Sequence, residues 1–228
     1  MATRTLKTVV FMGSARDIQA PWGGDARLGD RVLNHVKKVL QSRESKMGEE
    51  TVKHEFTVYD PLEVFNKDTG ALASSGAELR TPHFFFGAGK APAAMDAMRD
   101  KIKEADCYLI VTAEYNHTLP PALTSMMGHF GGSNYALKPS AVVTYSVGPW
   151  GGGRAAMAAR PMLSELGCLP VSKLTCFPTV SEIFNEDGTP KDESHRMLKQ
   201  LPAMLCELEW MGIAMSDMRK KVPNPQPQ

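Results

Sequence analysis

Short, uninterrupted apolar runs alternate along the chain with longer stretches in which apolar residues recur every three or four positions. Such runs are typical of parallel strands buried on both faces, because these strands have no side that meets water. We predict five strands, at residues 6–12, 52–59, 106–112, 140–145 and 169–177. The second should stop at Asp60-Pro61, since the residue before a proline is restricted in conformation.

The stretches with helical spacing lie between these strands. Leu28, Val32 and Val36 recur on one face, which predicts a helix over 29–42. Further helices are predicted at 92–104, 121–130 and 154–166, and a last helical stretch at 192–218. Two prolines fall inside these segments: Pro161 should bend the fourth helix, and Pro202 should interrupt the last stretch.

Strands that alternate with helices predict an α/β fold, in which a parallel sheet is covered by helices on both faces. In such sheets a ligand binds outside the carboxyl ends of the strands, where the strand order reverses. The loops after the first, third and fourth predicted strands are therefore the places to search for function.

Two segments have no regular period. Residues 66–90 are too long for an ordinary connection, and loops of that length are often functional or mobile. Within them, 82–87 contains three consecutive phenylalanines, which suit either a subunit contact or lid, or burial within the monomer. Residues 222–228 contain three prolines and are predicted to be a disordered tail.

Length and charge restrict the class of protein. A chain of 228 residues suits one domain, which we place at 1–221. The net charge of +1 provides no field to attract nucleic acid or an anionic membrane. No apolar stretch is long enough to span a bilayer and no secretory signal precedes the first strand, so we expect a cytoplasmic protein. The four cysteines lack metal-ligand spacing, and we predict no metal site.

The first of the three loops is Gly13-Ser14-Ala15-Arg16. Glycine lets backbone N–H groups turn toward an anion, the Ser14 hydroxyl can donate to a phosphate, and Arg16 adds a charged group. A plain turn with an exposed arginine is the alternative. The loop has neither the pattern of an ATP-binding P-loop nor that of a dinucleotide fold.

The second loop, 113–121, carries Tyr115, with a flat ring, and Asn116, with an amide that donates and accepts. Both suit a flat heterocycle with polar edges, although a turn with asparagine at its corner is the alternative. Glu114 and His117 resemble an acid–base pair in the sequence. Neighbours in a loop need not face each other, so we do not predict a catalytic role for them.

The third loop runs from Ser146 to Arg154 and has glycine at 148, 151, 152 and 153. Dense glycine permits close approach of the backbone to a ligand, and its N–H groups suit the carbonyl edge of a flavin. A flexible turn is the alternative. One anion-binding loop and two loops for a planar ring together indicate a mononucleotide with a heterocycle, and FMN meets all three requirements.

With these residues the chain resembles the NADPH-dependent FMN reductase family. The similarity spans about residues 6–180 and rests on four segments, at 13–16, 27–32, 114–123 and 145–161. It implies a flavodoxin-like, doubly wound, five-stranded parallel sheet with strand order 2-1-3-4-5. It also implies a homodimer or homotetramer.

The resemblance further implies the cofactor contacts. Phosphate contacts fall on Ser14 and Arg16. Ring contacts fall on seven residues of the second and third loops: Glu114, Tyr115, Asn116, Ser146, Gly148, Gly151 and Gly152. Gly13, Arg27 and Leu28 complete the predicted cofactor-binding set.

Two features depart from the family pattern. Ala113 stands where the family commonly has proline, which implies a less rigid second loop. Residues 17–26 are additional and imply a reshaped phosphate loop, in which Trp22 either covers the flavin or packs at the surface.

The predicted function is an FMN-dependent NAD(P)H oxidoreductase. Hydride would pass from NADPH or NADH through bound FMN to a small acceptor such as a quinone, free flavin or a metal oxyanion. This predicts ping-pong kinetics and no catalytic side chain. The alternative is a flavodoxin-type electron carrier serving a protein partner, which the net charge of +1 disfavours because such carriers are strongly acidic. A receiver-like module is disfavoured by Thr112-Ala113-Glu114, where a phosphate-accepting aspartate would be expected.

Overall fold

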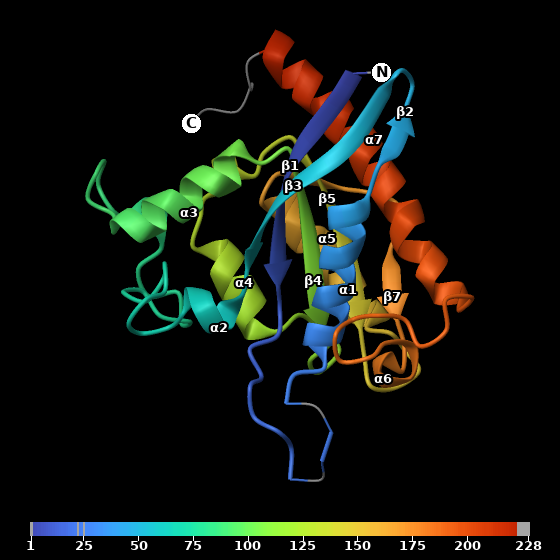
Figure 1. The fold of residues 1–228 in the computed structure, drawn as a ribbon. Coiled ribbons are helices and arrows are strands. Elements are labelled where there is room, and N and C mark those ends of the chain that lie inside the picture. The colour runs from blue at the N-terminus through green and yellow to red at the C-terminus, as the bar shows by residue number, and fades with distance from the viewer. Residues whose placement is uncertain (1, 22, 25, 223–228) are drawn as a thin grey trace.

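A central sheet organises the chain in the computed structural model, which describes residues 2–21, 23–24 and 26–222 (Figure 1). The strands are β1 (Ala2–Met12), β2 (Ser45–Met47), β3 (Glu50–Tyr59), β4 (Cys107–Ala113), β5 (Lys138–Tyr145), β6 (Cys168–Pro170) and β7 (Thr175–Phe177). They form one sheet in the order β2-β3-β1-β4-β5-β6, and β7 also pairs with β5. All pairings are parallel except that of β2 with β3.

The prediction of five strands in the order 2-1-3-4-5 is therefore wrong. The additional strand β2 is the short first arm of a hairpin that turns at Gly48, where φ is +61°. The predicted fifth strand is two strands: β6 ends at Pro170, β7 begins at Thr175, and carbonyls between them bond outside the sheet. The Arg160 guanidinium donates to the carbonyls of Val171 and Ser172 at 3.0 and 2.7 Å. The first strand also begins at Ala2 rather than Leu6.

Helices cover both faces of the sheet. They are α1 (Gly29–Ser42), α2 (Pro61–Val64), α3 (Ala93–Glu104), α4 (Pro121–Gly128), α5 (Gly153–Glu165), α6 (Val180–Ile183) and α7 (Gln200–Lys221). The core on one face joins α2, α3, α4 and α5 to the sheet, and the core on the other joins α1, α6 and α7 (Figure 1). This arrangement confirms the predicted flavodoxin-like α/β class.

The last helix corrects the prediction of an interruption at Pro202. A short 3₁₀ helix (Arg196–Lys199) leads directly into α7, and Pro202 is the third residue of α7. Proline is tolerated in the first turn because N–H groups there have no partner within the helix. After α7 the Val222 N–H donates to the Met218 carbonyl at 2.8 Å. Residues 223–228 of the predicted tail lie outside the described residues.

The long segment 66–90 is held against the core. Leu72 is fully buried, and Ser75 Oγ lies 2.7 Å from Nε2 of His129. A 3₁₀ helix (His83–Phe85) carries the first two of the three phenylalanines. Phe84 and Phe85 are exposed, whereas Phe86 packs against the core, so burial within the monomer holds for Phe86 and a subunit contact or lid stays a prediction for the other two.

A buried polar cluster, which we call the Glu209 cluster, joins α7 to β2 and β3. Glu209 is fully buried, and its carboxylate accepts hydrogen bonds from Arg43, Ser45 and His54. The Arg43 Nη2–Oε2 and Ser45 Oγ–Oε2 distances are 2.9 and 2.8 Å, and His54 Nε2 lies 3.1 Å from Oε1. Burial opposes the charge of Glu209, but its three donors outweigh burial and lower its pKa.

Among the described residues, no helix combines the length and the apolar character that crossing a bilayer requires.

Candidate cofactor-binding site

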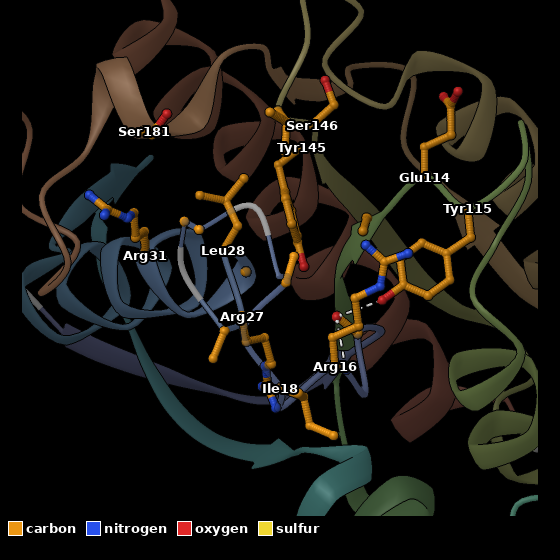
Figure 2. Close-up of a pocket in the computed structure, with 18 residues that line it drawn as sticks. Arg16, Ile18, Arg27, Leu28, Arg31, Glu114, Tyr115, Tyr145, Ser146 and Ser181 are labelled. Carbon is orange, nitrogen blue, oxygen red and sulfur yellow. Dashed lines mark hydrogen bonds between the residues drawn. The ribbon is translucent and has the colours of Figure 1, made fainter.

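A pocket of about 680 Å³ opens at the carboxyl ends of β1, β4 and β5, where the sequence predicted a ligand site (Figure 2). The segment between β1 and α1 extends past the strand ends and forms one wall (Figure 1). The lining residues are Ser14, Arg16, Ile18, Ala20, Gly23, Gly24, Ala26, Arg27, Leu28, Gly29, Arg31, Ala113, Glu114, Tyr115, Tyr145, Ser146, Val147 and Ser181.

The first loop leaves β1 through a turn that needs glycine. The Gly13 N–H donates to the Val111 carbonyl at 2.8 Å, and this bond holds the loop against β4. A Cβ at residue 13 would lie 2.3 Å from Thr112 Oγ1, so a larger residue would push the loop off the sheet. Gly13 therefore positions the next residue, Ser14, which is buried and lines the pocket.

The first and second loops meet at Ser14, Tyr115 and Arg16. Ser14 Oγ lies 2.9 Å from the Tyr115 hydroxyl, and the Arg16 N–H donates to Ser14 Oγ at 3.4 Å. The Arg16 guanidinium lies over the Tyr115 ring, 4.5 Å from its centroid (Figure 2). Two hydroxyls and an exposed guanidinium thus converge on one end of the pocket, which suits an anion. Arg16 occupies one face of the Tyr115 ring, so that face is not open to a heterocycle in this arrangement.

Arg27, by contrast, is committed to a protein carboxylate. Its side chain is 4% exposed and makes a bidentate ion pair with Asp60, with Nη1–Oδ1 at 2.9 Å. Its Nε also lies 3.0 Å from Asp30. Burial opposes the charge, but hydrogen bonding and attraction by Asp60 outweigh it and raise the pKa of Arg27. Arg27 and the adjacent Leu28 line the pocket, and the ion pair fixes this wall to the end of β3.

The second loop is a tight hairpin. Tyr115 and Thr118 exchange both backbone hydrogen bonds, at 3.0 and 2.9 Å, and Asn116 and His117 both have positive φ. This two-residue turn places Asn116 and His117 at its tip, outside the described lining of the pocket. The Glu114 carboxylate accepts from the backbone N–H and Nε of Arg154, at 3.0 and 2.7 Å, so it caps α5. Glu114 and His117 therefore do not form an acid–base pair.

The third loop is largely bonded to itself. Ser146 Oγ donates to the Gly148 carbonyl at 2.7 Å and accepts from the Gly151 N–H at 2.9 Å. Gly151 and Gly152 have φ of +60° and +76°, and Gly152 abuts Thr144. Ser146 lines the pocket, whereas Gly148, Gly151 and Gly152 are not among the described lining residues.

The described residues between 17 and 26 contribute to the pocket wall. Ile18, Ala20, Gly23, Gly24 and Ala26 all line the pocket, and a reshaping of the first loop by this segment stays a prediction. Ile18 is 81% exposed, so it offers an apolar surface to a ligand rather than to the core. Trp22 lies outside the described residues.

Sequence reasoning missed Tyr145, Val147 and Ser181 as lining residues. Tyr145 ends β5; the sequence placed it in a strand and in the segment 145–161 that carries the resemblance, but gave it no cofactor contact. Its position at the carboxyl end of a central strand was the signal that could have identified it, because those ends border the site. Ser181 lies in the short helix α6 beyond the predicted fifth strand, and nothing in the pattern connects it to the pocket.

Tyr145 is buried, at 3% exposed, and its hydroxyl has no hydrogen-bond partner among the described residues. Burial raises the pKa of Tyr145 well above its usual value, and Tyr115 adds to this effect, whereas Arg27 and Ser14 act in the opposite direction. The phenol is therefore protonated at neutral pH and is available as a donor.

The chain is similar to known proteins in sequence and in structure. The model of the NADPH-dependent FMN reductase family matches residues 6–179. A probable NADPH:quinone oxidoreductase 1 of Oryza sativa subsp. japonica is 34% identical over 95 residues, which cover 41% of this chain and 45% of that protein. A quinone reductase of Pseudomonas putida is 30% identical over 114 residues, covering 47% of this chain and 61% of that protein. The chain thus spans about half the length of the curated relatives that it matches.

Solved structures share the fold. The flavoenzyme NAD(P)H:(acceptor) oxidoreductase FerB of Paracoccus denitrificans superposes with a TM-score of 0.60 at 19% identity, covering 93% of this chain and 98% of that one. An oxidoreductase of Corynebacterium diphtheriae superposes with a TM-score of 0.57 at 10% identity, covering 92% and 98%. At these identities the likeness establishes the architecture.

The pocket fits FMN in size and in chemistry. Its volume lies within the roughly 300–1,000 Å³ of small-molecule sites. Ser14 and Arg16 provide the donors that a phosphate needs, and the buried Tyr145 hydroxyl is a donor without a partner among the described residues. Leu28 and Val147 offer apolar surface for a flat ring.

Proposed function

Because the chain belongs to the NADPH-dependent FMN reductase family, we propose that it is an oxidoreductase that binds FMN in this pocket and transfers electrons from NAD(P)H to a small acceptor. The observation that carries the proposal is the convergence of Ser14, Arg16 and Tyr115 at one end of a pocket at the carboxyl ends of the strands.

Different residues of the pocket would bind different parts of FMN. Ser14 and Arg16 would hold the phosphate, since a hydroxyl and a guanidinium are both strong donors to an anion. The backbone around Glu114, together with Ser146 and Val147, would border the ring. Arg27 would act indirectly, because its ion pair with Asp60 fixes the wall on which Leu28 stands.

FMN bound here would supply the hydride chemistry, accepting two electrons from a nicotinamide and giving them to the next substrate. The protein would then bind, orient and exclude water without a general base. This agrees with the engagement of the Glu114 carboxylate by α5 and with the position of His117 at the tip of its hairpin. Ile18, on the outer wall, would give an incoming planar substrate an apolar surface.

The acceptor is proposed to be a quinone, free flavin or a metal oxyanion. Nicotinamide and acceptor would occupy the same space in turn, which is a ping-pong scheme. Initial rates with varied NADPH, at several fixed concentrations of a soluble quinone, should give parallel double-reciprocal lines. Intersecting lines would mean that both substrates bind together and would refute this scheme.

A flavodoxin-type carrier is the alternative that these rates also test, because a carrier would show no turnover with NADPH and a quinone. A cytoplasmic location and a homodimeric or homotetrameric state stay predictions.

A further inference from the structure

The Tyr145 hydroxyl is a buried polar group without a partner. Tyr145 ends β5 and borders the pocket, yet its buried hydroxyl has no assigned hydrogen bond among the described residues. A buried hydroxyl left unpaired is destabilising. Phenylalanine would therefore give the more stable protein here, unless something outside the chain bonds to the hydroxyl.

Gly29 makes room for this hydroxyl. It is the first residue of α1, and a Cβ at this position would lie 2.0 Å from the Tyr145 hydroxyl oxygen. The phenol thus rests against the N-terminus of a helix of 14 residues, where no side-chain hydrogen bond from the N-cap residue, Leu28, is described. A helix N-terminus carries partial positive charge and favours an anion.

Other donors surround the same point. Figure 2 shows the Tyr145 ring extending into the pocket, with its hydroxyl directed toward the side that Arg16 and Tyr115 border. The Tyr115 hydroxyl and Ser14 Oγ are 2.9 Å apart, and the Arg16 guanidinium is stacked on the Tyr115 ring. Three hydroxyls, one guanidinium and a helix N-terminus form a donor set that suits the several oxygens of a phosphate monoester.

We propose that Tyr145 is a phosphate-binding residue, which acts with Ser14 and Arg16 to select a phosphorylated flavin over an unphosphorylated one. Tyr115 belongs to the same end of the pocket through its hydroxyl, rather than to the ring-binding surface that the sequence suggested. This assignment rests on the proposed function, since it names the residue that distinguishes FMN from riboflavin within that site.

The test compares the binding of two flavins. Dissociation constants for FMN and for riboflavin are measured by quenching of flavin fluorescence, with wild-type protein and with Tyr145→Phe. The matched control is Tyr59→Phe, which removes a hydroxyl at the end of β3 from a residue outside the described pocket lining. Thermal melting of the flavin-free proteins is measured alongside.

The assignment predicts that Tyr145→Phe binds FMN about 10- to 100-fold more weakly, the range for loss of a hydrogen bond to a charged group. Riboflavin affinity should change little, and the control should bind both flavins like the wild type. The flavin-free variant should melt no lower than the wild type, because the hydroxyl has no partner to lose. Inorganic phosphate should compete with FMN for the wild-type protein and not with riboflavin.

Two results would overturn the assignment while leaving the proposed function intact. One is an unchanged FMN affinity in Tyr145→Phe, and the other is an equal loss of affinity for FMN and riboflavin. A wild-type protein that binds neither flavin would instead overturn the proposed function, and this assignment would fall with it.

Discussion

The pocket and the Glu209 cluster both gather charged and hydroxyl side chains against the same sheet, but they differ in how those groups are paired. In the Glu209 cluster a fully buried carboxylate is bonded to Arg43, Ser45 and His54. In the pocket the Tyr145 hydroxyl has no partner among the described residues, and the exposed Arg16 guanidinium rests on an aromatic ring.

This difference distinguishes polar groups that stabilise the fold from polar groups that are available to bind a ligand. Buried charges are tolerated when their partners are complete, and removing one partner exposes the full cost of burial. Groups that face a pocket without partners contribute little to folding and are available for binding. The same contrast holds between two arginines of the site, since Arg27 is paired with Asp60 whereas Arg16 lies exposed at the anion-binding end.

The largest expected effect comes from breaking the Glu209 cluster. Glu209→Ala should lower the free energy of unfolding by about 3–5 kcal/mol, because it leaves the largely buried Arg43 and the buried His54 side chain without their carboxylate. Glu207→Ala is the control on the same helix: Glu207 lies nearer the surface, where it accepts from Ser172 and Lys173, and its loss should cost clearly less than that of Glu209. Urea denaturation measures both, and equal losses would contradict the distinction.

A smaller loss of stability is expected from the third loop. Gly152→Ala should destabilise by at least about 1–2 kcal/mol, because its left-handed backbone disfavours a side chain. The new Cβ would also lie 2.8 Å from that of Thr144. Gly148→Ala is the control, since a Cβ there meets nothing within 4 Å. If both variants melted alike, the loop would not be held by the contacts described.

Arg16→Ala should change binding rather than folding. FMN affinity should fall about 10- to 100-fold through loss of a charged donor to the phosphate. The melting temperature of the flavin-free protein should stay the same, because the side chain is exposed. Arg80→Ala, at an exposed position outside the described pocket lining, controls for the change in net charge. An equal loss of FMN affinity in the control would show that the effect of Arg16→Ala comes from the change in net charge and not from a contact with the phosphate.

The smallest effect is expected from pH. Burial lowers the pKa of His35 and of His129 below the usual 6.5. Below about pH 6.5 the unfolded chain therefore binds more protons than the folded chain, and stability falls as the pH drops. Urea midpoints should decrease between pH 7 and pH 5.5, and the double variant His35→Gln, His129→Gln should flatten this decrease. If the urea midpoint decreased with pH equally in the double variant, groups other than these two histidines would cause the decrease.

The sequence predicted those parts of the fold that follow from local pattern. The helix over 29–42 has the predicted bounds, because its apolar stripe is packed against the sheet. The predictions that failed were those that depend on tertiary contacts or on exact helix boundaries. The gap in the last predicted strand is bonded by Arg160, a side chain of the preceding helix α5, and the passage of α7 through Pro202 depends on where α7 begins.

The site was predictable to a similar extent. Position at the strand ends identified Ser14, Arg16, Tyr115 and Ser146, all of which line the pocket. Side-chain direction was not available from pattern, so the sequence did not show that Asn116 lies at a hairpin tip outside the described lining, or that Tyr145 borders the pocket. Gly151 and Gly152 have positive φ in the turn before α5, and their predicted contacts with the cofactor stay predictions.

The most direct test of the central claim is the absorbance spectrum of the purified protein after addition of FMN and removal of excess flavin, followed by anaerobic addition of NADPH. The account predicts a retained flavin spectrum that bleaches on addition of NADPH. A flavin spectrum that stays oxidised would contradict the reductase assignment and favour a carrier. Failure to retain FMN would contradict the assignment of the pocket itself.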